Sequence, residues 1–191
     1  MDLGHDRCDR CLFQRRSCLC AQIPAVTTAT QIVIVRHHSE HDRASNTGRL
    51  AHRALPNSVV VEHGAPGIPT VLPPLDGAWV LYPGGAPRTT APVPLPKQLI
   101  VLDATWSQAR KMFQKLTVLR GLPLLTLPVA PMPAARLRAS PGPGQVSTIE
   151  AIARALRLLE GDAAAVPLEE LFSLAVARVS ALGQRPRDGA S

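Results

Sequence analysis

The chain has 191 residues, of which 46% are hydrophobic but only 3% aromatic, and it carries a formal net charge of +7. This length suits one domain with a single core, and the lack of long apolar runs and the charged N-terminus argue against a membrane span or signal peptide. The excess of Lys and Arg favours a polyanionic partner such as nucleic acid, and we expect a cytoplasmic protein with no membrane partner.

Residues 1–24 form a polar head that has neither helical nor strand periodicity and contains all four cysteines. Cys8 and Cys11 form a Cys-x-x-Cys pair, and Cys18 and Cys20 form a Cys-x-Cys pair after six intervening residues. Four thiolates at this spacing are typical of a closed, structural zinc site. A reducing compartment disfavours two disulfides, whereas free thiols, a redox pair and iron–sulfur ligation stay open as alternatives.

Residues 25–183 alternate between strand and helix patterns, which predicts an α/β domain with a mostly parallel sheet flanked by helices. Each expected strand is a short aliphatic or β-branched run bounded by Pro, Gly or charge, and such runs suit a sheet covered on both faces. The expected strands are 31–35, 58–61, 78–82, 99–102 and 122–127. Residues 184–191 are expected to form a loose tail.

Helical periodicity is clearest after the fourth strand, where Ala109, Met112 and Phe113 share one face. A second helix is predicted over 149–159. A third is predicted to start with Pro167 in its first turn and to run to about residue 182.

Asp103 and Trp106 directly follow the expected strand 99–102, so they are predicted to lie at the carboxyl end of that strand. Ligands of open α/β sheets bind at this edge, which makes Asp103 a candidate functional acid. Asp103 or Thr105 is equally suited to cap the following helix, and Trp106 is equally suited to simple packing. Ser147 and Glu150 have the form of a capping box, and a capped helix start also attracts carboxylate or phosphate.

Several short motifs follow the cysteines in a fixed order, and together they resemble the DTW-domain family over nearly the whole chain. The motifs are His37-x-x-Glu40, Asn46-Thr-Gly-Arg-Leu50, Tyr82-Pro83, Asp103-x-Thr-Trp106, Arg136-Leu-Arg138 and Ser147-Thr-x-Glu150. The Asp-x-Thr-Trp block is the most specific of them.

The resemblance implies a tRNA-uridine aminocarboxypropyltransferase with a SPOUT-like, knotted α/β fold. Such an enzyme moves the 3-amino-3-carboxypropyl group of S-adenosylmethionine to N3 of a tRNA uridine, in bacterial members typically in the variable loop, and releases methylthioadenosine. The expected partners are therefore tRNA and S-adenosylmethionine, with zinc at the cysteines. The alternatives are a SPOUT-type RNA methyltransferase and a non-enzymatic zinc-ribbon module that binds RNA.

Asp103 is expected to act as the general base that removes the proton from the uridine nitrogen. The dipole of the helix start at Ser147 is expected to hold the donor's carboxylate, and Trp106 to stack on adenine or uracil. The expected donor-binding residues are Tyr82, Pro83, Gly84, Thr105, Trp106, Leu127, Pro128, Ser147 and Thr148. The expected phosphate contacts are Arg49, Arg110, Lys111, Arg136 and Arg138, each with a solvated surface position as the alternative.

Overall fold

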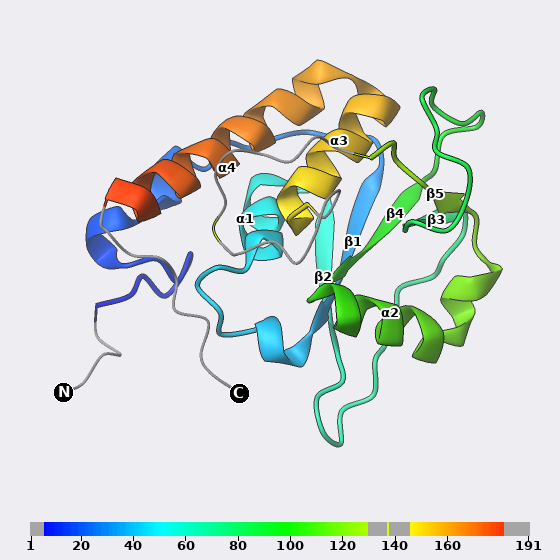
Figure 1. Ribbon diagram of the computed structural model, residues 1–191, viewed down its shortest axis with the longest axis horizontal. Coiled ribbons are helices and arrows are strands. Elements are labelled where there is room, and N and C mark those ends of the chain that lie inside the picture. The colour runs from blue at the N-terminus through cyan, green and yellow to red at the C-terminus, as the bar shows by residue number, and fades with distance from the viewer. Residues whose placement is uncertain (1–5, 130–136, 138–145, 182–191) are drawn as a thin grey trace.

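Five parallel strands form the centre of the protein, and helices cover both faces of the sheet (Figure 1). The computed structural model describes residues 6–129, 137 and 146–181. The strands lie in the order β2-β1-β4-β3-β5. Their bounds are β1 Gln31–His37, β2 Ser58–His63, β3 Ala78–Leu81, β4 Gln98–Asp103 and β5 Leu124–Leu125. The predicted α/β class with a mostly parallel sheet is confirmed.

Alternating side chains of the strands enter two separate cores, one on each face of the sheet. Ile34 of β1 packs under the helices α1, α3 and α4, whereas Val35 packs on the face covered by α2. The bounds of the helices are α1 Thr47–Ala54, α2 Trp106–Lys115, α3 Thr148–Glu160 and α4 Asp162–Ala181. Because both faces are covered, the strands read as continuous apolar runs, as the sequence predicts.

Single turns of 3-10 helix complete the described structure. They are η1 Arg15–Ser17, η2 Cys20–Gln22, η3 His38–Glu40 and η4 Thr117–Gly121. None of the described helices combines the length and apolar character needed to cross a bilayer.

The last strand is shorter than the sequence predicts, because β3 ends at Leu81 and because Pro123, which has no N–H to donate, directly precedes β5. β5 pairs only Leu124 and Leu125 with the end of β3, rather than extending over 122–127. Directly after β5 the side chain of Thr126 bonds the segment that follows β3: its hydroxyl donates to the carbonyl of Tyr82 at 2.8 Å.

The last helix starts earlier than predicted. Gly161 adopts a φ of 89° and ends α3, since its N–H bonds the carbonyls of Leu156 and Arg157. α4 begins at the next residue, so the prediction that Pro167 starts this helix was wrong. Pro167 lies inside α4, where it removes one backbone donor.

The cysteine-containing head packs against the C-terminal part of α4 (Figure 1). Phe13 and Leu19 of the head are buried in the same apolar core as Phe172 of α4. Arg178 of α4 also donates a hydrogen bond to the carbonyl of Cys18. The head is therefore anchored to the main core, while a domain boundary at residue 24 stays a prediction.

Candidate active site

The carboxyl ends of the parallel strands meet the starts of three helices along one edge of the sheet. Asp103 is the last residue of β4, and Tyr82 directly follows β3. Asn46 caps α1, Trp106 opens α2 and Thr148 opens α3. This edge therefore collects strand-end side chains and the N-termini of helices, the arrangement in which ligands bind to α/β sheets.

Asp103 lies at the centre of this edge and is only 3% exposed. Asn46 Nδ2 donates to Oδ2 at 2.6 Å, and Thr148 Oγ1 donates to Oδ1 at 2.7 Å. The register of the sheet places Asp103 opposite Arg36 of β1, on the face covered by α1 and α3. Three segments distant in sequence are thus joined through one carboxyl group.

The start of α1 passes so close to Asp103 that residue 48 has no room for a side chain. A Cβ atom added to Gly48 would lie 2.4 Å from Oδ2 of Asp103, well inside van der Waals contact. Glycine is therefore needed here for the approach of the helix backbone rather than for an unusual backbone angle.

The structure decides which residue caps α2. Thr105 is the N-cap: its side chain accepts a hydrogen bond from the Gln108 N–H, and its own N–H donates to Oε1 of Gln108. The carboxylate of Asp103 points to α1 and α3 instead. The interpretation of Asp103 as the cap of α2 was therefore wrong, and its carboxylate does not serve to start this helix.

Burial raises the pKa of Asp103 above its ordinary value of 3.8. Desolvation is the largest cause, and the hydrogen bonds from Asn46 and Thr148 oppose it. A carboxylate whose pKa is raised in this way is a stronger base than a solvated one.

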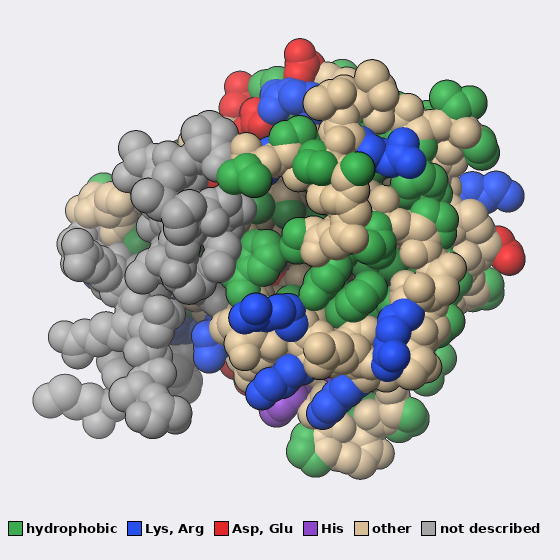
Figure 2. All heavy atoms as spheres, turned by 45° about the vertical axis from the view of Figure 1, so that its right-hand side comes forward, with side chains coloured by type: hydrophobic (Ala, Val, Ile, Leu, Met, Phe, Trp, Pro, Cys, Tyr) green, Lys and Arg blue, Asp and Glu red, His purple; other side chains and the backbone are tan. Residues whose placement is uncertain are grey.

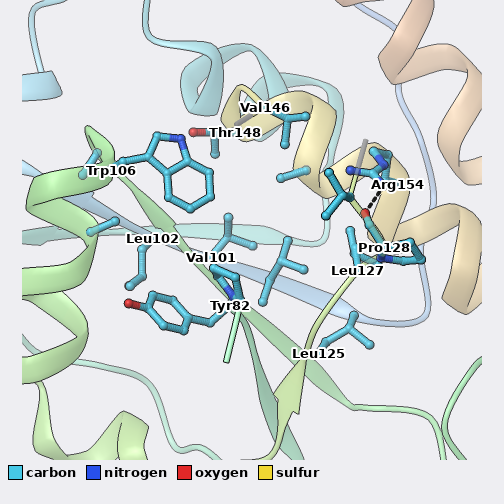
Figure 3. A pocket seen from close by; sticks show the side chains of 16 residues that line it. Tyr82, Val101, Leu102, Trp106, Leu125, Leu127, Pro128, Val146, Thr148 and Arg154 are labelled. Atoms are coloured by element: carbon cyan, nitrogen blue, oxygen red, sulfur yellow. Dashed lines mark hydrogen bonds between the residues drawn. The ribbon is translucent and has the colours of Figure 1, made fainter. Parts of the chain in front are cut away.

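A largely apolar pocket of about 190 Å³ opens beside this hydrogen-bonded centre, between the ends of β3, β4 and β5 and the starts of α2 and α3 (Figure 3). Six of the nine expected donor-binding residues line it: Tyr82, Pro83, Trp106, Leu127, Pro128 and Thr148. The other three do not line the pocket. Thr105 and Ser147 cap α2 and α3, and the Gly84 N–H donates to Oγ1 of Thr126. The fold thus brings together residues spread over 67 positions from Tyr82 to Thr148.

Aromatic rings form two walls of the pocket. Tyr82 stacks on Phe113 of α2 with ring centroids 4.2 Å apart and an interplanar angle of 10°. Trp106 lies across the pocket from the wall that contains Leu127 and Pro128 (Figure 3). Such faces suit a flat heterocycle such as a nucleobase.

Asp103 does not line the pocket; Thr148 lies between the two. Thr148 lines the pocket, and its hydroxyl donates to the Asp103 carboxylate at 2.7 Å. A proton that moves from a ligand in the pocket to Asp103 would therefore pass through the Thr148 hydroxyl.

Arg154 also lines the pocket, and the sequence patterns did not single it out. It follows Thr148 and Ala151 at intervals of three residues, so the three side chains share one face of α3. Its Nη2 donates to the carbonyl of Pro128 at 2.6 Å (Figure 3). The spacing from Thr148 is the signal that would have identified it.

The expected phosphate contacts differ in their surroundings. Arg110 and Lys111 are exposed on α2. On the face drawn in Figure 2, Lys and Arg side chains gather beside an apolar hollow. Arg49 is half-buried and donates to the carbonyl of His41, and desolvation lowers its pKa. Arg136 and Arg138 lie outside the described residues.

The four cysteines form a compact cluster of free thiols whose ligand atoms all lie within 4.8 Å of one another. The sulfurs of Cys8 and Cys20 are 3.7 Å apart, and those of Cys11 and Cys18 are 3.8 Å apart. A tetrahedral site with Zn–S bonds of about 2.3 Å places its sulfurs about 3.8 Å apart. The donor set and its spacing therefore fit one zinc ion, and the described structure contains no disulfide between these cysteines.

The cysteine thiols differ in their acidity. The backbone N–H groups of Cys11 and Arg10 lower the pKa of Cys8 to about 6. Desolvation raises the pKa of Cys20 to about 12, a penalty that a bound cation would offset.

A protein family and several known proteins are similar to this chain. A family model described as the DTW domain matches residues 5–180. The chain is similar to tRNA-uridine aminocarboxypropyltransferase 2 of Macaca fascicularis and of Mus musculus, each 29% identical over 169 residues, which cover 80% of this chain and 56% of the relative. The protein of that name from Drosophila melanogaster is 25% identical over 171 residues, covering 81% of this chain and 67% of the relative. The chain thus spans little more than half the length of the first two relatives, and no solved structure matches it.

Proposed function

Because this chain belongs to the DTW-domain family, we propose that it is a tRNA-uridine aminocarboxypropyltransferase that takes its transferred group from S-adenosylmethionine. The observation that carries the proposal is the pocket at the strand ends, which combines apolar and aromatic walls with a hydroxyl bonded to a buried carboxylate. Relatives named for this activity support it.

In the proposed reaction, N3 of a tRNA uridine attacks the γ-carbon of the methionyl group. The new N–C bond forms as the C–S bond breaks, and its electron pair stays on sulfur, so methylthioadenosine leaves as a neutral thioether. The product is 3-(3-amino-3-carboxypropyl)uridine, which we place in the variable loop. Holding nitrogen, carbon and sulfur in line supplies much of the rate, because it makes the displacement effectively intramolecular.

The uridine nitrogen must also lose its proton, and we assign this step to Asp103 acting through Thr148. The proton of N3 passes to Thr148 Oγ1 while the Thr148 hydroxyl proton passes to Oδ1 of Asp103. The 2.7 Å bond between these two groups and the 3% exposure of Asp103 support this route. Asn46 holds the second carboxylate oxygen and thereby fixes its orientation.

We propose zinc as the ion held by Cys8, Cys11, Cys18 and Cys20. Four thiolates would complete its coordination, so the ion would stabilise the head and have no open position for substrate. The head lies at the C-terminal end of α4, on the other side of the molecule from β3 and β5 (Figure 1). This position supports a structural role for the metal.

Arg110 and Lys111 are the phosphate contacts we propose among the described residues, together with Arg136 and Arg138 of the sequence motif. The exposed basic side chains beside the hollow support this assignment (Figure 2). We also propose a cytoplasmic location, where the thiols stay reduced, and a SPOUT-like knot.

Incubating the full chain with unmodified tRNA and S-adenosylmethionine labelled in the methionyl carbons tests the proposal. Nucleoside mass spectrometry is expected to find labelled aminocarboxypropyl-uridine, together with free methylthioadenosine. A methylated nucleoside with S-adenosylhomocysteine would instead identify an RNA methyltransferase. Binding of tRNA without any binding of S-adenosylmethionine would indicate a non-enzymatic RNA-binding module.

A further inference from the structure

Arg154 stands on the wall shared by two adjoining hollows. One is the apolar pocket of about 190 Å³, and the other is a wider hollow of about 620 Å³. Arg154, Leu127 and Pro128 line both. Small-molecule sites usually enclose about 300 Å³ or more, so a ligand as large as S-adenosylmethionine extends beyond the apolar pocket and past Arg154.

Arg154 is the one charged side chain among the described residues that line the apolar pocket. Within the described part of the chain no carboxylate lies within ion-pair distance of Arg154. Arg157, three residues further along α3, is instead paired with Asp162 and Glu169. The hydrogen bond to the Pro128 carbonyl uses one N–H group of the Arg154 guanidinium. Among the described residues the other N–H groups of this guanidinium meet no further partner, so they can reach an anion, and an arginine fork matches a carboxylate in shape.

The start of α3 is a poor second candidate for that anion. The carboxylate of Glu150 already lies there, accepting bonds of 2.8 Å from Ser147 N and 2.6 Å from Ser147 Oγ. Asp103 lies beside the same helix start, bonded to Thr148. Two acidic side chains would oppose a third carboxylate, so the helix dipole is already compensated.

We propose that Arg154 binds the amino-acid carboxylate of S-adenosylmethionine, an inference that rests on the function proposed above. This carboxylate belongs to the group that is transferred, not to the methylthioadenosine that leaves. Arg154 therefore holds the end of the donor that remains with the RNA. Methylthioadenosine, which lacks this carboxylate, loses that contact and can leave the pocket.

Isothermal titration calorimetry of the full chain with S-adenosylmethionine and with methylthioadenosine tests the assignment. Arg154→Gln is expected to weaken binding of S-adenosylmethionine about tenfold or more, the usual effect of losing a hydrogen bond to a charged group. Binding of methylthioadenosine is expected to change less than about threefold. Arg154→Lys keeps the charge but not the fork, so we expect an intermediate loss.

Arg120→Gln is the matched control. Arg120 is an exposed arginine that also donates to a backbone carbonyl, that of Gln114, but it does not line either hollow. Both ligands are expected to bind this variant as they bind the wild type. Equal losses for both ligands in Arg154→Gln, or no loss for either, would overturn the role of Arg154 and leave the proposed function standing. Failure of the wild type to bind either ligand would overturn the proposed function itself, and this inference with it.

Discussion

The carboxyl group of Asp103 receives its two hydrogen bonds from different helices, through Asn46 at the cap of α1 and Thr148 at the start of α3. The two bonds restrict its rotation, and burial raises its pKa. A base that is held in place and partly desolvated suits proton removal from a weakly acidic N–H group. Its position behind Thr148 makes the threonine hydroxyl as important as the carboxylate.

Substituting Asp103 or Thr148 is expected to stop proton transfer from the bound uridine. Asp103→Asn and Thr148→Val should each lower the single-turnover rate of transfer, measured at saturating S-adenosylmethionine, by about 100-fold or more. Because both groups belong to one route, the double variant should be no slower than Asp103→Asn alone.

Thr27→Val is the matched control for the threonine, since Thr27 is exposed and precedes β1 at the opposite edge of the sheet. Its rate should equal that of the wild type. A Thr148→Val variant with the wild-type rate, next to an inactive Asp103→Asn, would show that Asp103 reaches the substrate without Thr148.

The raised pKa of Asp103 also affects stability. Folding favours the protonated form, so its contribution is most stabilising below the ordinary pKa of 3.8 and is lost as the pH rises through the folded-state value. Asp103→Asn does not titrate. The unfolding free energy of the wild type minus that of Asp103→Asn should therefore fall as the pH rises from about 4 to about 8, measured by urea unfolding. A difference that rises with pH would show that Asp103 is stabilised as its anion.

Among the secondary-structure elements, α1 has the closest approach to the site. The approach depends on Gly48, because a Cβ there would lie 2.4 Å from Asp103. Gly48→Ala is expected to displace the helix start and the Asp103 carboxylate, costing about 1–3 kcal/mol in unfolding free energy and most of the transfer activity. This loss would occur even though alanine favours helices more than glycine does.

Gly121→Ala provides the comparison, since a Cβ at Gly121 meets nothing within 4 Å. Thermal melting and transfer assays should leave this variant close to the wild type. If Gly48→Ala behaved in the same way, the contact between α1 and Asp103 would not be required.

The head and α4 form one packed unit, so loss of the metal should weaken the main core as well. Cys8→Ser removes one of four thiolates and is expected to abolish stoichiometric zinc binding and lower the melting temperature, because metal binding contributes to folding. The folded fraction should still bind S-adenosylmethionine, since the head lies on the other side of the molecule from β3 and β5 (Figure 1), whose ends line the pocket. Metal analysis by mass spectrometry, melting and calorimetry measure the three effects. Folded, metal-free protein that binds no donor would contradict the separation of the two sites.

Across the whole molecule, the net charge of +7 and the basic side chains beside the hollow favour long-range attraction of RNA (Figure 2). Replacing Arg110 and Lys111 by Gln should weaken tRNA binding and make the slope of log affinity against log salt shallower by about 2. Lys97→Gln is the control, because Lys97 is exposed at the amino-terminal edge of the sheet, opposite the site. An unchanged slope in the Arg110/Lys111 variant would remove α2 from the RNA-binding surface.

Local patterns in the sequence determined the α/β class, the position of Asp103 at a strand end and the grouping of the four cysteines. Each of these depends on residues close together in the chain, through side-chain period, turn signals or ligand spacing. The length of β5 and the start of α4 were misjudged, because the first depends on a short neighbouring strand and the second on Gly161 ending α3.

Only the tertiary structure decided what Asp103 contacts and which residues form the pocket. Asn46 and Thr148 are 57 and 45 positions from Asp103, and they meet it because β4 lies beside β1 under α1 and α3. Arg154 reaches the pocket for the same reason: its spacing from Thr148 places the two on one face of α3, but only the packing of α3 on the sheet turns that face to the pocket. Strand order and register bring these residues together, and neither is encoded in the local period of the chain.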